Sequence, residues 1–163
     1  VLYYLYNKIN KSDYSCRITK YSRGSEYRLQ EAPFHKGSGN IIFGGIQEAE
    51  CKINGSGSIQ GSQAGNLKVT INGSGDFKVN EISGSIKSSI NGSGNIYIKS
   101  GQMDKLEAKI NGSGDIDAKN ITAKVADVSI KGSGNIIIGR VIEESIEQHS
   151  RNGSIKILRR GNE

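Results

Sequence analysis

Residues 90–94 read Ile90-Asn91-Gly92-Ser93-Gly94, a pentapeptide that recurs through most of the 163-residue chain. Six successive copies lie 18, 18, 19, 20 and 20 residues apart. A fixed period of this length is typical of a solenoid, in which each repeat forms one coil and packs on the next. Identical copies begin at Ile53, Ile71 and Ile110, variants begin at His35 and Ile130, and a degenerate seventh copy, which we interpret as lacking the second glycine, covers residues 151–155.

Apolar residues recur at alternate positions on both sides of each motif copy, as in strands with one buried face. Residues six and eight positions after the motif isoleucine form one segment, and residues four and two positions before it form another. A weaker set, eleven positions after the isoleucine, allows a third short segment in each coil. The inward sets are Ile41, Ile59, Phe77, Ile96, Ile116 and Ile136; Phe43, Gly61, Val79, Ile98, Ala118 and Ile138; Ala49, Leu67, Ile86, Leu106, Ala126 and Ile146; Cys51, Val69, Ser88, Ala108, Val128 and Gln148; and Ile46, Ala64, Ile82, Gly101, Ile121 and Val141.

Two all-β arrangements compete for this pattern. Asn-Gly between alternating segments is a strong hairpin signal, which would give an antiparallel meander. In a meander, however, neighbouring strands run in opposite directions, and identical motifs would not lie side by side. We therefore predict an all-β fold, a single-stranded right-handed parallel β-helix (β-solenoid) of about 6–7 turns of 18–20 residues, with the hand taken from parallel crossovers in general.

The repeat divides the chain into one domain with two flanking segments. Residues 1–34 contain six of the seven tyrosines and do not fit the inward sets, so we predict an N-terminal cap or assembly segment there. Residues 35–158 form the predicted solenoid, and residues 159–163 form a polar tail. Because one isolated coil cannot bury enough apolar surface to stay folded, both ends of such a stack need covering.

Composition and charge narrow the class of protein. The formal net charge is +6, which suits anionic partners or a mildly basic soluble protein, but the basic residues are dispersed and predict no nucleic-acid site. No apolar stretch has the length of a spanning helix, and no export signal is visible, so we expect no membrane insertion within this chain. An outward row of mixed sign predicts a few cross-turn ion pairs: Glu50, Lys68, Lys87, Glu107, Asp127 and Glu147.

The glycines of the motif resemble a phosphate-binding loop only superficially. A P-loop continues with lysine and then serine or threonine and leads into a helix, whereas here an alternating strand follows. We therefore predict that the glycines form tight corners, and that stacked motif asparagines and serines form hydrogen-bonded ladders. The asparagines that begin formal N-glycosylation triplets are Asn10, Asn54, Asn72, Asn91, Asn111, Asn120 and Asn152, most of them by-products of the turn motif.

Candidate catalytic and metal-binding residues are sparse. Asp76 and Asp115 follow the motif two turns apart, a separation of about 9.6 Å that would suit an inverting pair of carboxylates, but no sugar-binding cleft is evident around them. Calcium ligation would need aspartates in nearly every repeat. His35 and His149 lie near opposite ends of the stack and cannot share a metal. We predict no catalytic, cofactor-binding or metal-binding residues, and no cofactor.

The two cysteines leave the redox compartment open. Cys51 belongs to an inward set, where a thiol packs as a small apolar group. If Cys16 belonged to the same set, it would lie two turns below Cys51, beyond the reach of a disulfide. A bridge requires the N-terminal segment to fold back along the coil.

The repeated Ile-Asn-Gly-Ser-Gly-Asp/Asn-Ile/Phe, with its Leu-x-Val/Ala-x lead-in, resembles the bacterial head-GIN domain family of candidate auto-transporter adhesins. The resemblance covers about residues 36–158. It implies a right-handed parallel β-helix in a secreted or lipid-anchored envelope protein, and it brings no catalytic residues. The family more often has serine where this chain has the second-position asparagine, and residues 1–34 do not match.

Three functional hypotheses follow. The first is a non-enzymatic cell-surface or extracellular module whose stacked rows bind a glycan or a protein on a cell surface. The second is a subunit of a self-assembling extracellular filament, a homo-polymer in which the strand edge at one end of the solenoid pairs with the next copy. The third is a polysaccharide-cleaving enzyme.

Overall fold

The computed structural model describes residues 14–21, 30–31 and 40–161. Every regular element in these ranges is a β-strand, and none of the described residues form a helix that is long and apolar enough to cross a membrane. The strands are β1 (Tyr14–Tyr21), β2 (Gln30–Glu31), β3 (Asn40–Gly55), β4 (Ser58–Gly73), β5 (Asp76–Ile82), β6 (Ile86–Gly92), β7 (Asn95–Gly112), β8 (Ile116–Gly132), β9 (Asn135–His149) and β10 (Ser154–Arg160).

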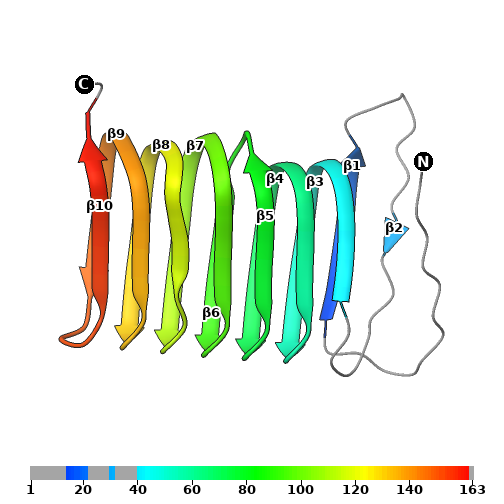
Figure 1. The fold of residues 1–163 in the computed structure, drawn as a ribbon, viewed down its shortest axis with the longest axis horizontal. Coiled ribbons are helices and arrows are strands. Elements are labelled where there is room, and N and C mark those ends of the chain that lie inside the picture. Colours follow the sequence, from blue (N-terminus) through cyan, green and yellow to red (C-terminus); the bar gives the residue numbers. More distant parts are fainter. Residues whose placement is uncertain (1–13, 22–29, 32–39, 162–163) are drawn as a thin grey trace.

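Equivalent residues of successive coils lie side by side in parallel register. From β3 to β10 every strand pair is parallel, and the coils follow one another along the long axis of the molecule (Figure 1). The chain is therefore a parallel β-solenoid of about 6 turns, which confirms the predicted fold class and excludes the antiparallel meander. The motif isoleucines in one such row are Ile53, Ile71, Ile90, Ile110 and Ile130.

Each coil is built from at most two strands, whereas the sequence allowed three short segments. The segments are separate only in the coil that contains β5 and β6, where residues 83–85 lie between them. In the other complete coils one strand of 15 to 18 residues continues through the corner. Ile82 is the last residue of β5, so the weaker apolar set lies at the end of the first segment and not on a third strand.

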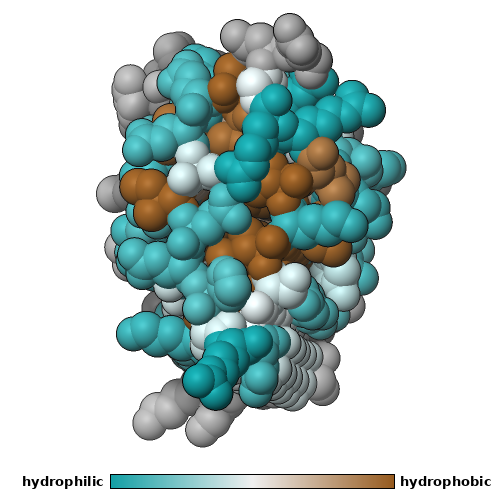
Figure 2. Space-filling view, turned by 90° about the vertical axis from the view of Figure 1, so that its left-hand side faces the viewer, coloured by the Kyte–Doolittle hydropathy of each residue, from teal (hydrophilic) through white to brown (hydrophobic). Residues whose placement is uncertain are grey.

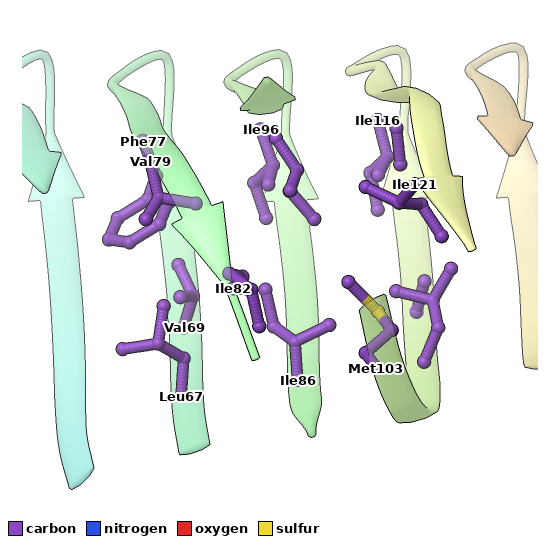
Figure 3. Close-up of a cluster of buried hydrophobic side chains, with 14 of the residues drawn as sticks. Leu67, Val69, Phe77, Val79, Ile82, Ile86, Ile96, Met103, Ile116 and Ile121 are labelled. Carbon is purple, nitrogen blue, oxygen red and sulfur yellow. The ribbon is translucent and has the colours of Figure 1, made fainter. Parts of the chain in front are cut away.

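The core fills the space inside the coils (Figure 3). Phe77 and Phe43 come from coils on either side of Gly61, and their ring centroids are 6.3 Å apart. A Cβ atom on Gly61 would collide with the Phe43 ring, so the glycine makes the space in which the two rings meet. Met103 and Ala123 are inward residues that no predicted set contained, because the longer coils carry an extra corner position. Val141 pairs with Ala123, so its predicted place level with Ile121 is wrong.

The motif forms a tight corner, as predicted. Its first glycine has a positive φ, +135° at Gly92, where a side chain would also contact the carbonyl oxygen of Gly73 in the preceding coil. Motif serines such as Ser93 donate their backbone N–H to that same row of carbonyls. The predicted ladder is made by the asparagine side chains, each donating its amide N–H to the previous coil: Asn72 to Asn54 at 2.7 Å, Asn91 to Asn72 at 2.8 Å and Asn111 to Asn91 at 2.9 Å.

The last coil departs from the predicted register. Ser145, and not Ile146, lies opposite Ala126, because the β8–β9 pairing shifts within the preceding corner. A one-residue shift moves a strand residue to the other face. Ile146 is therefore an outward residue, 45% exposed, and Gln148 is also exposed instead of inward.

The degenerate seventh motif copy also aligns differently from the prediction. Ser154 pairs with Asn135, which places Gly153 level with Gly134, the second glycine of its motif. A Cβ atom on Gly153 would contact Ile130, just as one on Gly134 would contact the isoleucine of the coil before it. The copy has therefore lost its first glycine and kept its second.

The chain folds back on itself before the first coil. Strand β1 pairs antiparallel with β3, and its register sets Cys16 directly opposite Cys51. Cys51 is disulfide-bonded, and Cys16 is the only other cysteine of the sequence. Of the two alternatives that the sequence left open, the fold-back of the N-terminal segment is therefore the one that occurs, and continued parallel winding through Cys16 is excluded.

The opposite end of the stack presents apolar side chains. Ile155 and Ile157 of β10 are partly buried against the core, whereas Leu158 is 48% exposed. Figure 2 faces this end and shows apolar groups gathered in its middle, with hydrophilic side chains across them. Arg160 donates hydrogen bonds to Ser145 and Glu147, so a charged contact joins β10 to the end of β9. Strand β10 continues through Arg160, into the segment that the sequence assigned to the polar tail.

Candidate functional site

An exposed tyrosine lies in the middle of the first strand segments, on their outward face. Tyr97 of β7 has Lys78 of β5 beside it in the coil before and Asp117 of β8 in the coil after. The residue is 38% exposed, and the surface next to it is hollowed to a volume of about 290 Å³. We call this the Tyr97 hollow, lined by Lys78, Val79, Asn80, Tyr97, Ile98, Lys99, Asp117, Lys119 and Asn120.

Neighbouring charged groups contact the Tyr97 ring and raise the pKa of its hydroxyl group. The Nζ atom of Lys78 lies 5.4 Å from the ring centroid, a cation–π contact that steadies the ring. Burial raises the pKa of the Tyr97 phenol above its ordinary value, and the negative charges of Asp76, Asp115 and Asp117 raise it further. The phenol is therefore neutral at physiological pH and offers both an O–H donor and an acceptor to a ligand.

The charged groups in the wall of the Tyr97 hollow are only partly paired. Lys119 donates to Asp117 at 2.9 Å. Lys99 forms no ion pair with any described residue, and Lys78 contacts the Tyr97 ring instead of a carboxylate. A solvent-facing site that combines an aromatic ring with unneutralised cations is equipped for binding, and nothing in it resembles a nucleophile beside a base.

The two aspartates considered for catalysis belong to a second polar ladder. Asn95 lies between Asp76 and Asp115; it donates its side-chain amide to Asp76 at 3.0 Å and accepts the Asp115 backbone N–H at 3.1 Å. Asp115 in turn accepts from Asn135 of the next coil at 2.9 Å. The carboxylates are thus two coils apart, as the sequence predicted, and each bonds to an asparagine that connects successive coils.

A second hollow lies at a corner of the coils, but its charges are neutralised. It measures about 480 Å³, with Leu67 and Ile86 among its apolar lining residues. Lys68 pairs with Glu50 at 2.7 Å and Lys87 with Glu107 at 2.8 Å, so the predicted mixed row does form cross-turn ion pairs. The full lining is Glu48, Ala49, Glu50, Asn66, Leu67, Lys68, Ser85, Ile86, Lys87, Lys105 and Glu107.

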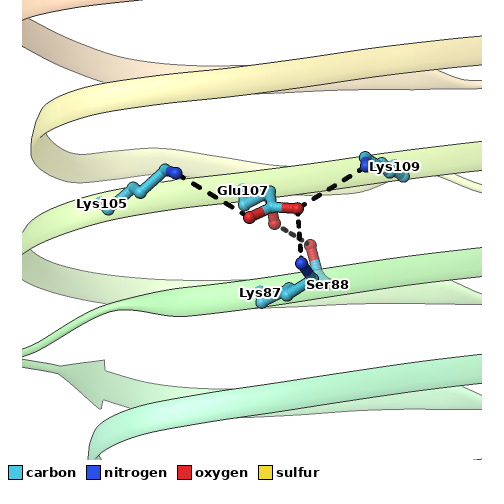
Figure 4. A network of polar contacts seen from close by, with 5 residues as sticks. All are labelled: Lys87, Ser88, Lys105, Glu107 and Lys109. Atoms are coloured by element: carbon cyan, nitrogen blue, oxygen red, sulfur yellow. Dashed lines mark hydrogen bonds and ion pairs between the residues drawn. The ribbon is translucent and has the colours of Figure 1, made fainter.

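Glu107 is the centre of the corner network (Figure 4). Its carboxylate also lies 3.9 Å from Lys105 and 3.7 Å from Lys109, and its side chain is only 16% exposed. The hydrogen bond from Lys87 lowers the pKa of Glu107, against an opposing effect of burial, and the charges of the three lysines lower it as well. Ser88, a buried polar residue, donates to the Glu107 backbone carbonyl at 3.2 Å.

Replacing Glu107 with glutamine is expected to lower the free energy of unfolding at pH 7 by about 0.5–1 kcal/mol. Because the folded-state pKa of Glu107 is depressed, its contribution is complete above the unfolded-state pKa and is lost as the pH falls through the folded-state value. Urea unfolding of wild type and variant at a series of pH values between 2 and 7 should therefore give curves that converge on the acid side.

A matched control for this prediction is Glu81→Gln, because Glu81 is exposed and forms no ion pair with the described residues. Its effect should stay within about 0.5 kcal/mol at every pH. A Glu107→Gln deficit that persists unchanged at low pH would contradict the electrostatic explanation.

The remaining candidates from the sequence are the two histidines considered as metal ligands. His149 is exposed next to Ser150, and His35 lies outside the described residues. No group of three or more potential metal ligands occurs among the residues whose placement is described. Tyr97 was missed, although one signal was present in the sequence: it is the only tyrosine outside the N-terminal segment, at an outward position of the repeat.

One family model matches the chain, and it does so twice, over residues 34–101 and 49–158. The family is described as "putative auto-transporter adhesin, head GIN domain". No curated protein and no solved structure gives a significant match. The matched residues include the whole solenoid as far as Leu158, with every complete copy of the motif. Because the repeat, the parallel coil and this family model all agree, the chain belongs to the head GIN domain family.

Proposed function

We propose that this protein is a non-enzymatic, adhesin-like module of the cell surface or the extracellular space, and that it binds glycans through the Tyr97 hollow. The observation that carries the proposal is an exposed aromatic ring set among amides and unneutralised lysines on a rigid sheet. Ligand sites commonly combine an apolar contact surface with a few polar groups that orient the ligand. A tyrosine ring offers this surface to the C–H face of a sugar.

The disulfide supports an extracytoplasmic location. Cys51 is fully buried and disulfide-bonded, and its register partner is Cys16. Disulfides persist in oxidising compartments and are rare in a reducing cytosol. The family description points to the same location.

The rigidity of the solenoid supports a binding role. Parallel pairing joins each coil to its neighbours, so the outward side chains of successive coils keep fixed spacings of about 4.8 Å. A ligand that spans several coils meets a preorganised surface, which lowers the entropy cost of binding.

A glycan array probed with labelled protein tests this function. We expect wild type to bind a subset of glycans and Tyr97→Ala to lose that binding, because the ring provides the stacking surface. Ile42→Ala is the matched control: Ile42 is 75% exposed in another coil of the same sheet, away from the hollow, and its replacement should leave binding unchanged. An array without signal, or signal that Tyr97→Ala leaves intact, would reject glycan binding at this site.

End-to-end assembly into a filament is the second candidate function. The observation that favours it is the C-terminal end of the stack, where Ile146 and Leu158 are exposed. Among the described residues β10 pairs only with β9, so one edge of β10 has no strand beside it. An open edge of this kind is a template for pairing with another chain. Electron microscopy of concentrated protein separates the two candidates, since a filament predicts rods of many lengths and a monomeric binder predicts short particles of one size.

Polysaccharide cleavage has less support. Asp76 and Asp115 both accept hydrogen bonds from ladder asparagines, and the Tyr97 hollow lacks a second carboxylate beside Asp117. An assay for reducing ends or unsaturated sugars released from acidic polysaccharides, with Asp115→Asn alongside, tests this alternative directly.

A further inference from the structure

Charge is distributed unevenly around Tyr97. Asp76 lies at the start of β5 and Asp115 just before β8, at the level of Asn95, two residues before Tyr97. Two residues along a strand correspond to about 6.6 Å. Lys99, two residues after Tyr97, lies beyond the ring in the opposite direction. A ligand seated on the ring therefore has Asp76 and Asp115 toward one end and Lys99 toward the other. The carboxylate beside the ring itself, Asp117, is paired with Lys119.

The cationic end has more positive charge than its own carboxylate can neutralise. Three lysines and one aspartate line the Tyr97 hollow, and the aspartate is engaged by Lys119 at 2.9 Å. In the corner hollow, by contrast, the lining lysines Lys68, Lys87 and Lys105 all lie within 4 Å of a glutamate carboxylate. Of the two hollows, only the Tyr97 hollow therefore has lining lysines without a carboxylate within 4 Å.

Neutral polar groups complete the lining. Asn80 and Asn120 lie in the wall with Lys99. A side-chain amide both donates and accepts hydrogen bonds, as the hydroxyl groups of a sugar do. The hollow thus presents an aromatic face, two amides and an unpaired cation within the width of two to three coils.

We propose that the ligand of the Tyr97 hollow is an acidic sugar, a pyranose with a carboxylate or sulfate group, and that Lys99 binds its anionic group. The proposal rests on the proposed glycan-binding function and specifies its ligand. The sugar ring stacks on Tyr97 with its hydroxyls toward Asn80 and Asn120. Its anion points away from Asp76 and Asp115, because like charges at the other end repel it.

Lys99→Gln is the decisive variant, and three short oligosaccharides of the same length are the probes: a hexuronate, a sulfated hexose and an uncharged hexose. Binding is measured by surface biosensor at 150 mM salt. We expect wild type to prefer at least one charged probe, and the preferred arm identifies the anion. Lys99→Gln should weaken that probe about tenfold without changing the uncharged one, since a charge-assisted hydrogen bond is lost. Lys99→Arg should restore most of the affinity.

Two further variants separate site-specific from general effects. Lys131→Gln removes another exposed lysine, one that forms no ion pair with the described residues and lies outside the hollow, and it should leave all three affinities unchanged. Tyr97→Ala should abolish binding of charged and uncharged probes together. Far-ultraviolet circular dichroism and a thermal unfolding curve of each variant establish that the coil is intact.

The possible failures are distinguishable. If the uncharged probe binds wild type as well as the charged ones and Tyr97→Ala abolishes both, the acidic ligand is rejected while glycan binding stands. If Lys131→Gln weakens the charged probes as much as Lys99→Gln does, binding follows net charge and the site is rejected. If no probe and no arrayed glycan binds, both proposals are overturned.

Discussion

Replacing Gly92 with alanine is expected to lower the free energy of unfolding by about 2–4 kcal/mol, a large effect for one added methyl group. Gly92 has a φ of +135°, which L-residues with a side chain adopt only under strain. Its Cβ atom would also meet the backbone carbonyl of Gly73, which cannot move without breaking the hydrogen bonds it accepts from Ser93 and Gly94. Urea unfolding followed by circular dichroism measures the loss.

Gly44→Ala is the control for this prediction. Gly44 also lies within a strand, but its φ is not in the strained positive range, and a Cβ atom added to it would have no other atom within 4 Å. Its replacement should change stability by less than about 0.5 kcal/mol or increase it slightly, because alanine restricts the unfolded chain more than glycine does. Equal effects of the two substitutions would show that the corner does not depend on the missing side chain.

Replacing Phe77 with alanine is expected to cost about 3–5 kcal/mol. Phe77 is fully buried and meets Phe43 across the space that Gly61 leaves, so its removal opens a cavity between three coils. Backbone ladders on both sides hold the coils at their spacing and limit the collapse that would fill the cavity. Thermal unfolding of the variant should have a midpoint temperature well below that of wild type.

The exposed residue Ile42 provides the comparison, since Ile42→Ala removes an apolar side chain that makes little core contact and should alter stability by less than about 0.5 kcal/mol. A double-mutant cycle with Phe43→Leu measures the coupling of the two rings. Independent effects of Phe43 and Phe77 would contradict their contact across Gly61, because contacting residues normally show non-additive effects.

The repeat predicted the parallel winding and most inward positions of the complete coils because each element of the pattern has one physical use. Alternation selects the buried face, the first glycine of the motif permits a positive φ, and asparagines stacked at one spacing bond to one another. The same reasoning failed for Ile146 and Gly153, because the last coil is shorter than the one before it and a count from the motif cannot locate where the missing residue falls.

The candidate site was much less predictable. An exposed tyrosine is unremarkable in a sequence, and its significance depends on which charges lie beside it in the coils before and after. Lys78 and Asp117 are 19 and 20 residues from Tyr97, yet both are its neighbours across the sheet.

Sequence alone determined the parallel winding, most of the inward rows of the complete coils and the corner glycines, because a periodic chain repeats the same local solution in every turn. Tertiary structure decided the features that occur once: the antiparallel return of β1 that sets Cys16 opposite Cys51, the shifted last coil, and the pairing that leaves Lys99 without a carboxylate among the described residues. These features depend on contacts between residues with no periodic relation, and the free energy of such contacts is fixed only when the surrounding coils are in place.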